Sequence, residues 1–143
     1  MTTAAADPSK PAATLSGGMD ATPATILVID DDAALRMLFE RYLTAFGYQP
    51  LLACDGEEAL RLAEITPEIR LVICDLVMSG SSARVVAEQL RAVLPHAAVI
   101  FCSGHPPSAL ARLGIDIQGA QFMQKPCRPL ELQQRVAAML AAR

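Results

Sequence analysis

The sequence predicts an α/β fold in which a doubly wound parallel sheet is covered by helices on both faces. From about residue 25 onward, short apolar runs alternate with longer segments whose apolar residues recur at a helical period, which is the pattern of βαβ units. Most of the short runs are continuously apolar, as strands buried on both faces should be. The chain of 143 residues is 52% hydrophobic, so we expect one globular domain with a substantial core.

Residues 1–24 predict a disordered leader or linker ahead of this domain. The segment consists almost entirely of Ala, Thr, Ser, Pro, Gly and Asp, and Lys10 is its only basic residue. Such a segment buries too little apolar surface to offset the entropy of ordering it. It also lacks the basic start and apolar run of a signal peptide. We therefore expect the globular domain to span residues 25–141.

The apolar runs predict five strands. Each run has the length of a strand, about four to eight residues, and is bounded by polar or turn residues. None approaches the roughly 18 residues that a membrane-spanning helix needs, so we expect no membrane partner. The predicted strands lie at Ile26–Ile29, Gln49–Ala53, Leu71–Cys74, Val99–Cys102 and Gln121–Met123.

Segments between the runs predict five helices, of which the first is the best defined. Its apolar residues recur at i, i+3, i+4, i+7, i+8 and i+11 from Leu35, with Asp32 as a suitable N-cap and Gly47 at its end. The other four helices are indicated by a capping pair, by the spacing of apolar residues, or by a proline in the first turn. They are predicted from Asp55 and Glu58 to about Glu64, from Val86 to Leu94 before Pro95, from Ser108 to Leu113 before Gly114, and from Pro129 to Leu140.

Polar side chains follow four of the predicted strands. Asp30 and Asp31 follow the first strand, Asp75 the third, Ser103 the fourth and Lys125 the fifth. The carboxyl ends of parallel strands meet at one edge of the sheet, where such proteins bind ligands. Three carboxylates there repel one another unless a proton or a cation relieves them, and oxygen ligands suit Mg²⁺. A carboxylate nucleophile, a divalent ion and a lysine are the working groups of phosphoryl transfer onto aspartate.

Four motifs follow one another along the chain. They are Ile26-Leu27-Val28-Ile29-Asp30-Asp31-Asp32, Leu71-Val72-Ile73-Cys74-Asp75-Leu76-Val77-Met78, Phe101-Cys102-Ser103-Gly104 and Phe122-Met123-Gln124-Lys125-Pro126. In this order they resemble the receiver domain of two-component response regulators, and the resemblance covers residues 25–141. It implies a flavodoxin-like sheet with strand order 2-1-3-4-5 and five helices.

The resemblance implies a role for each polar residue at the strand ends. Asp75 would accept the phosphoryl group. Asp31 and Asp75 would ligate Mg²⁺ directly, Asp30 would do so through water, and the backbone carbonyl of Val77 would complete the protein ligands. Lys125 would pair with Asp75 at rest and with the phosphoryl group afterwards.

Ser103 and Phe122 would form the switch that responds to phosphorylation. Ser103 would hydrogen-bond the new phosphoryl oxygen, and Phe122 would rotate inward behind it, driven by a change in local charge of about −1. We therefore expect a signalling domain rather than an enzyme with a separate substrate. Its phosphodonor would be a sensor histidine kinase or a histidine phosphotransfer protein.

Composition narrows the expected partners. The net charge of −3 and the aromatic content of 4% argue against nucleic-acid binding. Four cysteines without a CxxC pair predict reduced thiols and a cytoplasmic location. Beyond a receiver, the chain has no length for an effector domain, so we expect output through a protein partner. A phosphorylation-dependent homodimer is one such option.

The chain departs from the family pattern beside the acceptor. Ser79 and Ala83 stand where a proline and a glycine are usual, and Cys127 replaces an aromatic residue after Lys-Pro. The residue two positions after the acceptor tunes access of water to the phosphoryl group in this family. Because Val77 offers no hydrogen bond to water at that position, we hypothesise slow autodephosphorylation.

Three alternatives to a free-standing receiver involve the same residues. A Mg²⁺-dependent aspartate-based phosphatase would use the same carboxylates, but it wants a second acid where Val77 stands, and a cap domain. A nucleotide-binding oxidoreductase needs glycines where Asp30 and Asp31 stand. A receiver module excised from a hybrid sensor histidine kinase stays open, because the Ser103–Pro107 stretch and the short fourth helix resemble such modules.

Overall fold

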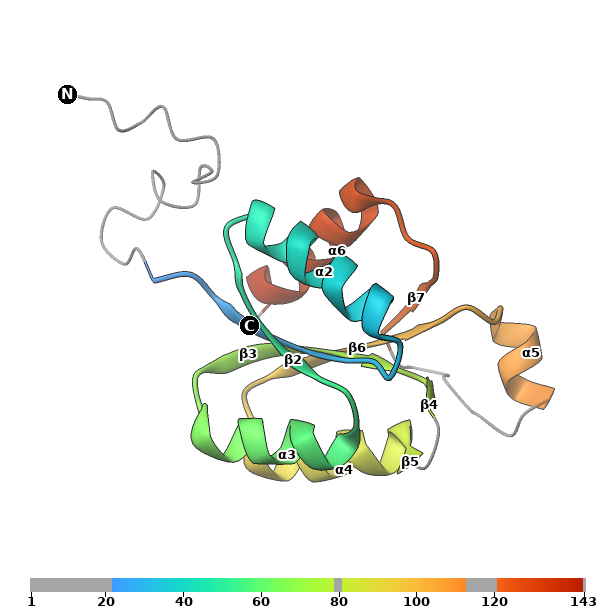
Figure 1. Ribbon diagram of the computed structural model, residues 1–143, viewed down its shortest axis with the longest axis horizontal. Helices are drawn as coiled ribbons and strands as arrows, with labels where there is room; N and C mark the ends of the chain where they lie inside the picture. The colour runs from blue at the N-terminus through green and yellow to red at the C-terminus, as the bar shows by residue number, and fades with distance from the viewer. Residues whose placement is uncertain (1–21, 79–80, 113–120, 143) are drawn as a thin grey trace.

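The computed structural model describes residues 22–78, 81–112 and 121–142, which Figure 1 draws in colour. Nearly all of the predicted leader lies outside these ranges. The expected end of the fourth helix at Leu113 and Gly114 also lies outside them, as does Ser79. Among the described residues, no helix is long and apolar enough to cross a membrane.

Within these ranges, the main sheet consists of five parallel strands. Their order is β2-β1-β3-β6-β7, which confirms the expected order 2-1-3-4-5 when the five are counted along the chain. Asp75 and Ser103 are the last residues of their strands, so both belong to the rigid sheet. The bounds are β1 (Thr25–Ile29), β2 (Gln49–Ala53), β3 (Ile69–Asp75), β6 (Ala98–Ser103) and β7 (Phe122–Gln124).

A second, two-stranded antiparallel sheet follows β3, and the sequence did not predict it. In it, β4 (Val77–Met78) pairs with β5 (Ser81–Ser82), with Val77 opposite Ser82. Strands of two residues are too short to show a period, which is why the pattern of apolar residues missed them. The pairing places the chain that leaves Asp75 beside the chain that enters the next helix.

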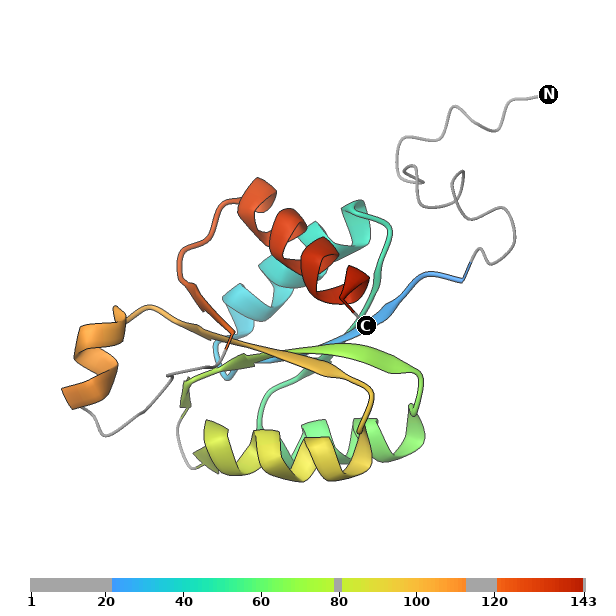
Figure 2. The ribbon, with the colours of Figure 1, turned by 180° about the vertical axis from the view of Figure 1, so that it is seen from behind.

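Helices cover both faces of the main sheet, as predicted. Two of them lie side by side on one face and two on the opposite face, as Figures 1 and 2 show from opposite sides. A fifth, short helix stands out at one end of the molecule and buries Leu110 in the core. The first pair is α2 (Ala33–Ala45) with α6 (Pro129–Ala141), the second is α3 (Gly56–Ile65) with α4 (Ala83–Val93), and the short helix is α5 (Pro107–Arg112).

Alternate residues of each strand supply the cores on the two faces. In β1, Leu27 and Ile29 pack in the core beneath α3 and α4, whereas Ile26 and Val28 pack in the core beneath α2 and α6. None of these four side chains is more than 1% exposed. Since both faces are covered, every position of the strand favours an apolar residue, which confirms the interpretation of the continuous apolar runs.

Side-chain caps hold the first turns of α2 and α3 at the carboxyl edge of the sheet. Asp32 accepts hydrogen bonds from two backbone N–H groups of α2, at 2.9 and 3.2 Å. Asp55 accepts one from the N–H of Glu58 at 2.8 Å. Gly47 ends the first helix with a positive φ of 94°, where a glycine is favoured. All three of these sequence predictions are confirmed.

Gly56 allows α3 and α4 to approach each other closely. A Cβ atom at Gly56 would lie 2.5 Å from Cγ2 of Val86, so we expect Gly56→Ala to lower the free energy of unfolding by about 1–3 kcal/mol through overpacking. Urea denaturation measures this change. Gly104→Ala is the control, because its Cβ would meet nothing within 4 Å, and its effect should stay within about 0.5 kcal/mol. Equal losses in the two variants would contradict the prediction.

Candidate functional site

Three carboxylates meet at the carboxyl edge of the main sheet, as the sequence predicted. Asp30 follows β1 and Asp75 ends the neighbouring β3, where Ile29 lies opposite Cys74. One oxygen from each of Asp30, Asp31 and Asp75 lies within 4.8 Å of the others. Asp30 and Asp75 are only 2% and 7% exposed, whereas Asp31 is exposed to solvent. Two of the three negative charges are therefore buried.

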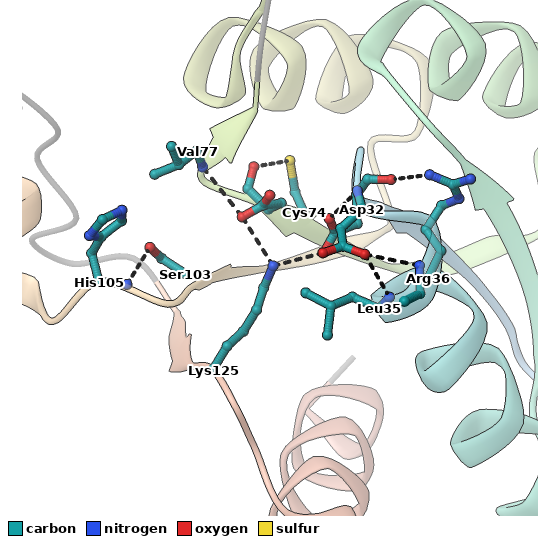
Figure 3. A network of polar contacts seen from close by, with 11 residues as sticks. Asp32, Leu35, Arg36, Cys74, Val77, Ser103, His105 and Lys125 are labelled. Atoms are coloured by element: carbon teal, nitrogen blue, oxygen red, sulfur yellow. Dashed lines mark hydrogen bonds and ion pairs between the residues drawn. The ribbon is translucent and has the colours of Figure 1, made fainter.

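Lys125 reaches the two buried carboxylates at once (Figure 3). Its Nζ lies 2.7 Å from Oδ2 of Asp30 and 3.3 Å from Oδ1 of Asp75. Its side chain is 11% exposed. Pairing with Asp75 was implied by the resemblance, but the contact with Asp30 is the shorter of the two. The peptide bond between Lys125 and Pro126 is cis.

Asp30 is held through its backbone and its side chain together. Its N–H donates to the carbonyl of Ala53 at 3.1 Å, and its own carbonyl accepts a hydrogen bond from Nη1 of Arg36 at 2.7 Å. Its Oδ1 accepts from the N–H of Asp32 at 2.9 Å, and its Oδ2 accepts from Lys125. Arg36 did not emerge from the sequence. The available signal was a cation in the first turn of a helix, where the helix dipole disfavours positive charge.

Burial and neighbouring charges shift the pKa values of Asp75 and Lys125. The pKa of Asp75 is raised by its burial and, to a smaller extent, by the charge of Asp30, against the lowering effect of Lys125. Burial by itself would lower the pKa of Lys125. Its hydrogen bond to Asp30 and the charges of both carboxylates outweigh burial, so that the pKa of Lys125 is raised. At Asp75, burial thus outweighs the lowering effect of Lys125 on the pKa.

Without divalent cations, we expect Asp75→Asn to stabilise the fold at about pH 7. A raised pKa in the folded state means that ionising Asp75 costs stability as the pH rises from its ordinary value of 3.8 through the raised value. Asparagine removes that cost. Urea denaturation in EDTA should show a more stable variant at neutral pH, with a difference that shrinks toward about pH 4. A variant less stable than the wild-type chain at neutral pH would contradict this prediction.

Ser103 and Phe122 lie on the two neighbouring strands at the far side of Asp75. Ser103 ends β6, is fully buried, and its Oγ accepts a hydrogen bond from the N–H of His105 at 3.0 Å. Phe122 begins β7 opposite Phe101 and is half-buried. Its carbonyl accepts a hydrogen bond from Nη1 of Arg135 at 2.9 Å. Ser103 thus lies at the same edge as the acidic cluster, whereas Phe122 lies on the adjacent strand two register positions before that edge.

The four cysteines, all within the described ranges, are free thiols. Cys74 and Cys102 directly precede Asp75 and Ser103 and are buried. Burial raises the pKa of Cys74 to about 12, and it also raises the pKa of Cys102. Both thiols therefore stay protonated at neutral pH, which fits the interpretation of them as small core residues.

The donor set at this edge suits a hard divalent cation. Asp30, Asp31 and Asp75 offer oxygen ligands alone, which favours a metal of the Mg²⁺ type. The ammonium of Lys125 pairs with two of these carboxylates, Asp30 and Asp75. Val77 begins β4 beside them, and its N–H donates to Oδ1 of Asp75 at 3.4 Å. The residues predicted as ligands are thus gathered at one place.

Comparisons with known sequences agree with this geometry. The profile of the family described as response regulator receiver domain matches residues 26–137. The chain is 31% identical over 115 residues to the alkaline phosphatase synthesis transcriptional regulatory protein PhoP of Bacillus subtilis (strain 168), covering 80% of this chain and 48% of that protein. It is 33% identical over 115 residues to the uncharacterized transcriptional regulatory protein YrkP of the same strain, with the same coverage. The chain spans about half the length of the curated relatives it matches.

Solved structures show the same fold. The receiver domain from the hybrid histidine kinase CckA is 35% identical, with a TM-score of 0.70, and the match covers 82% of this chain and 99% of that chain. A response regulator receiver domain protein from Clostridium thermocellum is 29% identical, with a TM-score of 0.71 and coverage of 83% and 95%. A receiver from Methanospirillum hungatei JF-1 is 20% identical and shares the fold, with a TM-score of 0.73 and coverage of 85% and 96%.

Proposed function

The chain belongs to the response regulator receiver domain family of two-component signalling, and from this premise we propose that Asp75 accepts a phosphoryl group from a phosphohistidine on a partner protein. Receiver domains are signalling domains, so the chain would catalyse only its own phosphorylation and dephosphorylation. The observation that carries the proposal is the buried carboxylate of Asp75, placed beside a lysine ammonium and two further carboxylates.

In the proposed reaction, a carboxylate oxygen of Asp75 attacks phosphorus. The new oxygen–phosphorus bond forms as the bond from phosphorus to the imidazole nitrogen breaks, and the histidine leaves. Lys125 is already held 3.3 Å from Asp75, so its ammonium is in place to stabilise the negative charge of the phosphoryl oxygens. Because Lys125 is held before the reaction, little reorganisation is needed when that charge moves.

We propose Mg²⁺ as the cofactor, held by the carboxylates of Asp31 and Asp75, by Asp30 through water and by the backbone carbonyl of Val77. The all-oxygen donor set of three neighbouring carboxylates supports this assignment. When bound, the ion neutralises charge on the phosphoryl oxygens in transit. The acidic cluster would by this means accept a negatively charged group despite its own charge.

Phosphorylation would be transmitted through Ser103 and Phe122. We propose that the hydroxyl of Ser103 donates a hydrogen bond to the new phosphoryl oxygen and that Phe122 rotates inward on β7. The position of Ser103 at the carboxyl edge and that of Phe122 on the adjacent β7 support this assignment. The added charge of about −1 would shift the equilibrium between the resting and the phosphorylated arrangement of Ser103 and Phe122.

The proposed partners follow from this chemistry. A sensor histidine kinase or a histidine phosphotransfer protein would supply the phosphoryl group, and a protein partner or a second copy of this chain would receive the signal. A cytoplasmic location is proposed because such donors carry their phosphohistidine there. The identity of 35% to the receiver from the hybrid histidine kinase CckA favours a donor of the phosphorelay type.

Incubation with Mg²⁺ and a small phosphodonor, such as acetyl phosphate, tests the proposal. Intact mass spectrometry should show a single phosphoryl adduct that does not form in EDTA. The adduct should also form when a phosphorylated histidine kinase replaces the small donor. If no adduct forms with either donor in the presence of Mg²⁺, the proposed function is wrong.

Val77→Asn is expected to shorten the lifetime of phosphorylated Asp75 by about two- to tenfold. Val77 is 41% exposed beside the acceptor and cannot hydrogen-bond an attacking water, whereas the amide of asparagine can orient one. Decay of the adduct after removal of the donor measures the lifetime. Val85→Asn is the matched control, since Val85 is 50% exposed in the first turn of α4. An unchanged or longer lifetime in Val77→Asn would contradict the hypothesis.

A further inference from the structure

Arg36 reaches the backbone of the acidic cluster from α2. Its Nη1 donates a hydrogen bond to the carbonyl of Asp30 at 2.7 Å, and Figure 3 shows the guanidinium beside the carboxylate network. The side chain is partly buried. We infer that Arg36 is a positioning residue for Asp31 and so sets the affinity of the site for a divalent cation.

The inference follows from the geometry of the peptide unit between Asp30 and Asp31. The carbonyl that accepts from Arg36 belongs to this planar unit, so holding its oxygen also fixes the direction in which the chain enters Asp31. On the other side of Asp31, the N–H of Asp32 donates to Oδ1 of Asp30 at 2.9 Å. The backbone is therefore held both before and after Asp31. This matters because Asp31 is the exposed member of the cluster, whereas Asp30 and Asp75 are buried.

The helix dipole disfavours a cation at the position of Arg36. Arg36 is the fourth residue of α2, near the end where the dipole is positive, although the N-cap of this helix is the acidic Asp32. A short, charge-assisted hydrogen bond to a backbone carbonyl compensates for that placement. The contact thus favours an arginine at this position.

Two effects of Arg36 on a bound cation have opposite signs. As a positive charge near three carboxylates, Arg36 repels a cation, so its removal alone would tighten binding. As the anchor of the Asp30 carbonyl, Arg36 keeps Asp31 in place, so its removal would weaken binding. We expect positioning to dominate, because the guanidinium charge is partly solvated whereas the hydrogen bond is direct and short.

Isothermal titration of MgCl₂ into the full chain distinguishes the two effects. The inference about Arg36 rests on the proposed function, because it assumes that the site binds Mg²⁺. We expect Arg36→Met to weaken Mg²⁺ binding by about tenfold, the lower end of the losses seen when an outer partner of a metal site is removed. Arg36→Lys keeps a donor of similar reach and should bind more tightly than Arg36→Met. The control is Arg41→Met, which removes the same charge from an exposed position on α2 and should leave the affinity unchanged.

Several results would overturn the inference. Affinity equal to or tighter than wild type in Arg36→Met would show that charge dominates, and equal losses in the Met and Lys variants would exclude the hydrogen bond as the cause. Urea denaturation in EDTA distinguishes a merely structural role of Arg36 from a positioning role. A merely structural role would lower the stability of Arg36→Met without changing its affinity for Mg²⁺. If the wild-type chain does not bind Mg²⁺, the proposed cofactor fails together with this inference. Wild-type binding with an unaffected Arg36→Met variant defeats the inference alone.

Discussion

Asp75→Asn is expected to lower the rate of phosphorylation by at least about 1,000-fold, which in practice removes the adduct. An amide oxygen is a much poorer nucleophile than a carboxylate oxygen, and the neutral side chain also removes one proposed ligand of the divalent cation. Lys125 keeps its shorter contact to Asp30 in the variant, so the fold of the site should survive. Intact mass spectrometry after incubation with acetyl phosphate and Mg²⁺ measures the outcome.

Asp55→Asn is the matched control for this experiment. It makes the same chemical change at an acidic residue that follows β2 at the same edge of the sheet. Asparagine caps helices about as well as aspartate, so α3 should keep its first turn. The control should be phosphorylated at the wild-type rate. An adduct of undiminished yield in Asp75→Asn would place the acceptor elsewhere in the chain.

Lys125→Met is expected to lower the free energy of unfolding by about 3 kcal/mol at neutral pH in EDTA. The substitution leaves the carboxylates of Asp30 and Asp75, which are 2% and 7% exposed, without their shared ammonium. The pKa of Lys125 is raised on folding. Its contribution to the free energy of unfolding is therefore complete when the pH is below the ordinary pKa of 10.5, and this contribution is lost as the pH rises through the raised pKa. Wild type and variant should therefore converge in stability at strongly alkaline pH. Urea denaturation at several pH values measures both effects.

Two further variants test the cause of this loss. Adding Asp75→Asn to Lys125→Met should recover part of the lost stability, because it removes one of the two unpaired charges. Arg61→Met breaks an ion pair with Glu57 whose side chains are 66% and 85% exposed and 3.9 Å apart. That control should lose less than about 0.5 kcal/mol. If the Lys125 and Arg61 variants lose equal stability, burial of the pair is not the cause.

The order of strands and helices could be predicted because apolar periodicity and N-cap residues are local signals. Asp32 and Asp55 predict the first turns of α2 and α3, and in the structure both side chains cap these helices. The strand bounds were less sharp. The structure begins β3 at Ile69 and extends it through Asp75, whereas the apolar run marked only Leu71–Cys74. A strand ends where its backbone pairing ends, and pairing depends on a neighbour that local composition does not reveal.

The membership of the acidic cluster could also be predicted, but its contacts could not. Asp30 follows β1 and Asp75 ends the neighbouring β3, so their approach follows from the pairing of these two parallel strands. The resemblance named Asp75 as the partner of Lys125, whereas the structure gives the shorter contact to Asp30 across a separation of 95 residues. The contact of Arg36 could not be predicted, because its hydrogen bond goes to a backbone carbonyl. Every residue has such a carbonyl, so no sequence motif indicates which one accepts the bond.

We could predict from the sequence alone the alternation of strands and helices, the burial of both faces of the sheet, and the set of acidic, hydroxyl and ammonium groups at its carboxyl edge. These follow from apolar periodicity and from the rule that parallel strands end at a common edge. The structure adds that Val77 pairs with Ser82 and that Lys125 lies closer to Asp30 than to Asp75. The two contacts of Lys125 differ by less than an ångström and join groups far apart in the chain, so they are fixed by the packing of the whole fold and not by local pattern.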